Sequence, residues 1–220
     1  MKKLALILFL AIGLTSLAQE KITEGKVTLK QTMSSDNEQV NAQLAMVGDI
    51  STTTYFKGNK SRTEVSSPMT GSNITIVDND LKKGIVLMDN PMMGKMYNET
   101  DLNVSEEDLS KIKVEKTTET KEILGYKCTA YKVTMTEQGM EMNMMMYTTE
   151  ELDIISDQAA KFGDGFKGFP LYMEINMTQQ GMAMTITTEA TAIDKESVSD
   201  EMFSLAVPEG YKKMDVPAGN

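Results

Sequence analysis

Hydrophobic and polar residues alternate along much of the chain, and the alternation is clearest between positions 140 and 147. The even-numbered positions of this stretch are all methionines: Met140, Met142, Met144 and Met146. A period of two is typical of a β-strand, because successive side chains of a strand point to opposite faces. The stretch therefore predicts a strand with four methionines on one face, with Met145 as the only apolar interruption on the other.

Two later stretches repeat this alternation. Met173, Ile175 and Met177 alternate with polar residues, and after a Gln-Gln-Gly turn Met182 and Met184 do the same. We therefore expect two long strands, over residues 171–178 and 181–193, beside the first one. Three such strands would place a methionine-lined surface on one side of a sheet.

The rest of the chain predicts about ten antiparallel strands and few helices. Residues 39–47 are interpreted as a continuing strand, and a short helix is expected after Ser105, which precedes three acidic residues. Thr148-Thr149-Glu150-Glu151 has the form of a capping box, and apolar residues then recur at helical spacing up to Phe162. These patterns predict an α+β domain in which a strongly curved antiparallel sheet carries a helix over residues 150–162 on its concave face.

Residues 1–18 have the form of a secretory signal peptide. Lys2 and Lys3 precede an apolar run of about a dozen residues, and Ser16 and Ala18 supply small residues for cleavage before Gln19. The expected mature protein is one domain over residues 19–220, secreted across the inner membrane, with the periplasm as its expected compartment. The run is shorter than the roughly 20 residues that a membrane span needs.

Composition excludes several functional classes. The 220 residues carry 32 acidic and 22 basic side chains, a net charge of −10, which argues against nucleic-acid binding. The chain has no histidine, so catalytic triads and histidine-ligated metal sites are ruled out. Cys128 is the only cysteine, and no base stands near it in the sequence pattern. We therefore expect a monomer without catalysis, cofactor or metal.

Four short motifs resemble a known family. They are FKGNKSRTE at 56–64, GYKCTAYKV at 125–133, GFPL at 168–171, and the segment from Phe203 to Tyr211. In this order they resemble an uncharacterised family of exported bacterial proteins, common in Bacteroidota. That family is similar to the lipoprotein carriers, whose fold is a half-open β-barrel with helices over a concave side that holds acyl chains. The resemblance implies a lipid-like ligand. It also implies that Arg62 corresponds to an arginine of the carriers and meets the polar headgroup of that ligand.

Three interpretations of the methionine face remain open at this stage. Methionine is an unbranched gap filler, so the face can be an ordinary packed core. Its flexible thioether also suits an adaptable apolar cavity for ligands of varied shape. Clustered thioethers prefer Cu(I), but the absence of histidine and the spread of the methionines over three strands weigh against a copper site.

We expect an exported protein that binds a lipid-like or other apolar ligand in a methionine-lined concave cavity. The alternative is an envelope structural or interaction protein with a packed core, no ligand and an envelope protein as its partner. The residues expected at the ligand are the following: Met140, Met142, Met144, Met146, Met173, Met177, Met182, Met184 and Arg62.

Overall fold

The structure is a computed structural model, and it describes residues 21–214 except 68–70, 138–139, 155–161, 164 and 180–181. The signal peptide expected at residues 1–18 lies outside this range. No helix among the described residues is long and apolar enough to span a membrane.

The described strands form one twelve-stranded sheet in the order β12-β6-β5-β4-β3-β2-β1-β11-β10-β9-β8-β7. All neighbours are antiparallel except β12 and β6. The strands are β1 (Glu24–Ser35), β2 (Ile50–Lys57), β3 (Lys60–Ser67), β4 (Gly71–Asp78), β5 (Lys83–Asn90), β6 (Gly94–Asp101), β7 (Ile112–Ile123), β8 (Tyr126–Glu137), β9 (Met140–Thr149), β10 (Phe169–Gln179), β11 (Met182–Asp194) and β12 (Lys212–Lys213). The expected curved antiparallel sheet is confirmed, with twelve strands in place of about ten.

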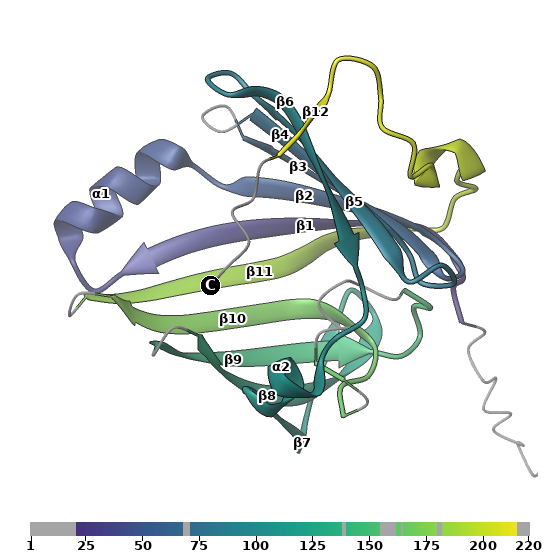
Figure 1. The fold of residues 1–220 in the computed structure, drawn as a ribbon. Coiled ribbons are helices and arrows are strands. Elements are labelled where there is room, and N and C mark those ends of the chain that lie inside the picture. Colours follow the sequence, from purple (N-terminus) through teal and green to yellow (C-terminus); the bar gives the residue numbers. More distant parts are fainter. Residues whose placement is uncertain are drawn as a thin grey trace, which may run out of the picture.

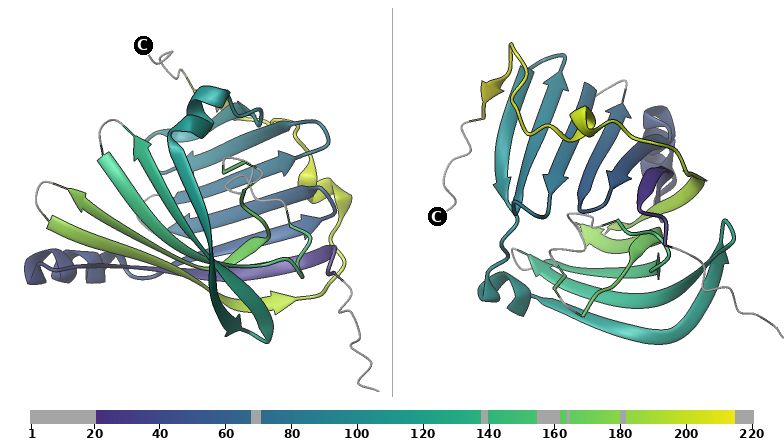
Figure 2. Two further views of the ribbon diagram at one scale, coloured as in Figure 1. Left: turned by 90° about the horizontal axis from the view of Figure 1, so that it is seen from below. Right: turned by 90° about the vertical axis from the view of Figure 1, so that its right-hand side faces the viewer.

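The sheet bends strongly at its middle, where β1 pairs with β11, and it does not close (Figure 1). Strands β2–β6 form an upper half and β7–β11 a lower half, and the two halves face each other across a concave side (Figure 2). We call the concave side the inner face; it carries Leu29, Phe56 and Met144. Side chains along a strand alternate between the two faces, so the pairing of each strand with the next assigns all remaining strand residues to the inner or the outer face.

Helix α1 (Glu38–Val47) replaces the strand expected at 39–47. The Asn37 side chain accepts hydrogen bonds from the backbone N–H groups of Gln39 and Val40, at 2.9 and 3.3 Å, and so caps the first turn. The segment lies outside the sheet, beyond the ends of β1 and β11 (Figure 1), so no neighbouring strand is available to pair with it. The short helix expected after Ser105 is confirmed as α2 (Glu106–Ser110).

The helix predicted at 150–162 is wrong over the part that the structure describes. Thr148 and Thr149 end strand β9, where they pair with Pro170 and Phe169 of β10. Leu152 forms a parallel bridge with Ile22, and the Ile22 N–H donates to the Glu151 carbonyl at 2.9 Å. The backbone groups that would open a helix are therefore used in sheet-like hydrogen bonds, while residues 155–161 lie outside the described range.

Apolar packing differs between the two halves of the sheet. The lower half packs the inner-face residues Tyr131, Val133 and Met146 against Phe166. The upper half instead packs the outer-face residues Ile76, Ile85 and Leu87 against the C-terminal segment, which includes the short helix η1 (Asp200–Phe203). A third cluster joins the halves through Leu29, Phe56 and Leu171, together with Leu152 and Phe169.

Candidate functional site

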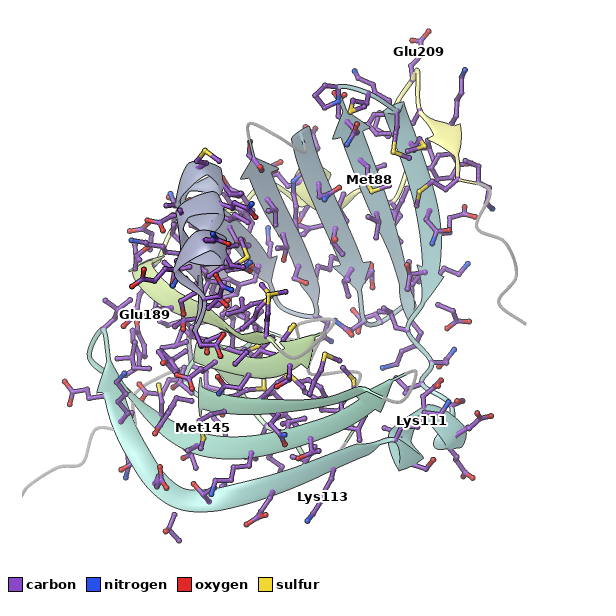
Figure 3. The ribbon with its side chains drawn as sticks, turned by 90° about the vertical axis from the view of Figure 1, so that its left-hand side faces the viewer. Met88, Lys111, Lys113, Met145, Glu189 and Glu209 are labelled. Atoms are coloured by element: carbon purple, nitrogen blue, oxygen red, sulfur yellow. The ribbon has the colours of Figure 1, made fainter. Side chains whose placement is uncertain are left out.

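The methionines of the sheet lie almost entirely on its inner face. Met144 pairs with Ile175, which pairs with Ile186, and Ile186 pairs with Met33 of β1, so the face continues across the middle of the sheet. From Leu29 the pairing runs through Thr52, Val65 and Asn73 to Met88. The methionines that this register assigns to the inner face are Met33, Met88, Met96, Met135, Met142, Met144, Met146, Met173, Met177, Met182 and Met184. Several sulfur atoms lie between the two halves in Figure 3.

Two of the predicted site residues are part of the packed core. Met144 is 7% and Met146 0% exposed, and both belong to the cluster that Phe166 covers. The ring of Phe166 lies 5.1 Å from that of Tyr131 and 5.1 Å from that of Phe162, centroid to centroid. Met173 packs against the same cluster. For this part of the face, the interpretation as packed core is the right one.

The other predicted methionines of the lower half are only half-buried. Met142, Met177, Met182 and Met184 lie towards the ends of their strands, beyond the Phe166 cover, and none of them belongs to the described core clusters. Met140 begins β9, and its side chain lies outside the described residues. The methionine face is thus divided along the strands into a packed part and a more open part.

The upper half contributes inner-face residues that the sequence did not single out. Val65, Val86, Met88 and Met96 are half-buried, and none of them belongs to the described core clusters. Figure 3 shows Met88 on the upper half, across the concave side from the lower strands. The alternation within each strand shows which of its residues share a face. Only the pairing of β1 with β11 shows that the methionines of the lower half and those of the upper half lie on the same side of the sheet.

Arg62 does not join the methionines. It pairs with Tyr55 and Ile76 and so lies on the outer face, beneath the C-terminal segment. Its Nε donates to Glu64 Oε1 at 2.5 Å, and its Nη1 donates to the Met202 carbonyl at 3.3 Å. The guanidinium therefore holds the C-terminal segment on the sheet and is remote from the inner face.

Thr188 supplies a polar atom on the inner face. It pairs with Met173 of β10 and Gln31 of β1, next to the packed part of the methionine face. Its hydroxyl oxygen is buried and has no hydrogen-bond partner among the described residues. A buried hydroxyl without a partner costs about 1–3 kcal/mol, so this position favours a ligand with a polar atom.

Cys128 has the properties of a structural residue. Its side chain is fully buried, and burial, with the negative charge of Glu151 as a smaller cause, raises the pKa of the thiol to about 11. Among the described residues no group of three or more His, Cys, Asp or Glu side chains is placed to hold a metal ion. Neither observation points to a catalytic centre in the described part of the chain.

Alkylation of Cys128 by iodoacetamide is expected to be very slow in the folded protein. At pH 8 a pKa of about 11 leaves roughly one thiol in a thousand as the reactive thiolate, about a hundredfold less than an ordinary cysteine. Burial slows the reaction further. Intact-mass measurement over time, with and without urea, checks this: rapid labelling of the native protein would contradict the assigned burial.

The outer face of the lower half has a shallow hollow of about 380 Å³. Lysine and glutamate line it together: Lys113, Glu115, Lys132 and Glu174, with Met145 between them. Figure 3 labels Lys113 and Met145 on β7 and β9. Because its charges are mixed and Glu174 already accepts from Tyr172 and Asn176, at 2.9 and 3.0 Å, the hollow does not select one ligand charge.

Comparison with solved structures finds shared architecture. A structure of PNGF-II matches 87% of this chain at 13% identity with a TM-score of 0.51, and this chain spans 31% of PNGF-II. The match shows a common fold with about a third of that protein. The Mycobacterium tuberculosis lipoprotein LppX matches 79% of this chain and 90% of its own at 9% identity, and its TM-score of 0.30 supports no conclusion.

No curated protein matches the chain. A family model described as a domain of unknown function does match, over residues 24–211. The match begins with the first residue of β1 and ends just before β12, so it covers nearly all of the described sheet, including the C-terminal segment on the outer face. The chain belongs to the family Domain of unknown function (DUF4412).

Proposed function

We propose that this protein is exported to the periplasm and binds an extended apolar ligand, such as an acyl chain, between the two halves of its sheet, without catalysis. The supporting observation is the open part of the inner face. Met142, Met177 and Met184 lie on the inner face of the lower half, Val86 and Met88 lie on the inner face of the upper half, and none of them belongs to a described core cluster. Half-buried apolar side chains outside the packed core are a usual lining of a ligand site.

The sheet also offers a physical reason for this opening. The upper half packs its outer face against the C-terminal segment, so its inner face is left for another partner. Thr188 lies on the inner face, and its hydroxyl, which has no partner among the described residues, would bind the polar end of an acyl ligand. In this proposal Thr188 has the role at the polar end of the ligand that the family resemblance implied for Arg62.

The size of the face suits a chain of moderate length. Four neighbouring strands span about 15 Å, since adjacent strands lie about 4.8 Å apart. Burying about ten methylenes contributes roughly 8 kcal/mol before the cost of association. Since a free energy of about −8 kcal/mol corresponds to a dissociation constant of about 1 μM, the constant expected after the cost of association is micromolar or weaker, which suits carrying or sensing a ligand.

A second candidate is an envelope interaction protein without a ligand. The burial of Met144 and Met146 beneath Phe166 favours it, because this part of the methionine face is already filled by the protein itself. Under that function a partner protein would cover the open methionines.

Native mass spectrometry of the mature protein, purified from a bacterial envelope, distinguishes the two. The proposal predicts an excess mass of several hundred daltons that organic extraction removes and that added fatty acid restores. A bare polypeptide mass with no uptake of fatty acid or phospholipid would contradict it and favour the second candidate.

A further inference from the structure

Four methionines on the inner face form a single row across the lower half. Met135 of β8 pairs with Met142 of β9, and Met177 of β10 pairs with Met184 of β11. Met142 and Met177 are the next positions beyond the Asn143–Asn176 pair, so they lie opposite each other. The row therefore brings four thioethers from four adjacent strands side by side, although their positions in the sequence are up to 49 residues apart.

The spacing of the row allows the sulfur atoms to converge. Residues opposite each other on antiparallel strands have Cβ atoms about 4.5–5.5 Å apart. Each methionine adds three rotatable bonds, so neighbouring sulfur atoms can turn towards a common point above the sheet. All four side chains are half-buried, which partly shields such a point from bulk water. Met135 also packs against the cluster beneath Phe166, which leaves Met142, Met177 and Met184 as the three neighbours outside the described core clusters.

The donor set selects one kind of ion. Neutral thioethers are soft ligands that prefer Cu(I), whereas Zn²⁺ and Cu²⁺ prefer imidazole, thiolate or carboxylate. The chain has no histidine, and its only thiol is buried with a raised pKa, so neither imidazole nor thiolate competes with the thioethers for the ion. The net charge of −10 also favours a cation.

We propose that Met142, Met177 and Met184, three neighbours in this row, bind a soft monovalent metal ion, Cu(I). One sequence argument against copper was the spread of the methionines over three strands, and the register removes it because β9, β10 and β11 are neighbours. This inference goes beyond apolar binding. The same three methionines lie on the open part of the inner face, but the metal requires sulfur, whereas an acyl chain requires only an apolar surface.

The test is a Cu(I) titration of the mature protein under anaerobic conditions, with bicinchoninate as the competing chelator. The wild type is expected to take one ion per chain from the chelator. The variant Met177→Leu/Met184→Leu is expected to lose this uptake, because leucine keeps the volume and apolar character but not the thioether. The matched control Met88→Leu/Met96→Leu, which removes a paired set of two methionines from β5 and β6, is expected to keep it.

Each outcome bears on the proposal. Failure of the wild type to compete, or unchanged uptake by the Met177→Leu/Met184→Leu variant, would overturn it. Far-ultraviolet circular dichroism of the three proteins should give the same spectrum, which separates loss of the metal site from loss of the fold. If the double variant fails to fold, NMR of methyl-¹³C methionine in the wild type decides: Ag(I), a Cu(I) substitute, must shift about three methyl signals, and a spectrum without shifts refutes the site.

Discussion

Phe203→Ala is expected to lower the free energy of unfolding by about 3–5 kcal/mol, the usual effect of removing a buried aromatic ring. Phe203 is 4% exposed and belongs to the cluster with Ile76, Ile85 and Leu87 on the outer face of the upper half. Loss of the ring also weakens the attachment of the C-terminal segment, whose Asp200 lies 2.9 Å from the Lys57 amino group.

Urea denaturation followed by far-ultraviolet circular dichroism measures this effect. Val207→Ala serves as the matched control, because Val207 lies on the same segment but is 36% exposed, so its truncation should change stability by less than about 1 kcal/mol. Equal, small effects of the two substitutions would show that the C-terminal segment does not pack on the sheet as described.

Met177→Asp combined with Met184→Asp is expected to abolish binding of an apolar ligand while the protein stays folded. Both side chains are half-buried, so their carboxylates can keep contact with water, yet they place two charges in the path of an acyl chain. Met144→Asp is expected to unfold the domain, because that carboxylate would be buried without a partner in the cluster beneath Phe166.

Titration with a fluorescent fatty acid measures the binding. The chain has no tryptophan, so the probe's emission is read against a low background. Met92→Asp is the control, since Met92 is 94% exposed in the turn between β5 and β6. This variant should bind the fatty acid as tightly as the wild type does. Undiminished binding by the Met177/Met184 variant would place the ligand elsewhere.

Much of the lower half was predictable because strand alternation is a local signal. The strands that carry Met142, Met173 and Met184 are present where the pattern places them, and each pairs with the expected neighbour. The cap at Ser105 was equally local, since it depends on a few adjacent side chains.

The errors arose where pairing over long distances decided the structure. Glu150 and Glu151 look like the start of a helix, but Ile22, more than a hundred residues away, binds the backbone there. The pattern correctly places Arg62 and Thr63 on opposite faces of their strand. The sequence does not show which of the two faces is the concave one. That choice depends on the C-terminal segment covering the outer face of the upper half.

The division of the methionine face could not be predicted for the same reason. Met144 and Met142 have the same parity and the same chemistry, and only the position of Phe166 separates the packed residue from the open one. Met33, Met88 and Met96 belong to the face because β1 joins β11, a contact between opposite ends of the chain. The sequence therefore predicted a methionine surface but not where it remains open.

The central claim is that the concave side binds the apolar ligand, and labelling with a photoreactive fatty acid tests it most directly. After irradiation and proteolysis, mass spectrometry should find the label on peptides that contain Met142, Met177 or Met184 and on those that contain Met88 or Met96. Excess unlabelled fatty acid should remove it. Two results would contradict the claim: label confined to outer-face peptides, such as the one around Phe203, or no label that excess unlabelled fatty acid removes.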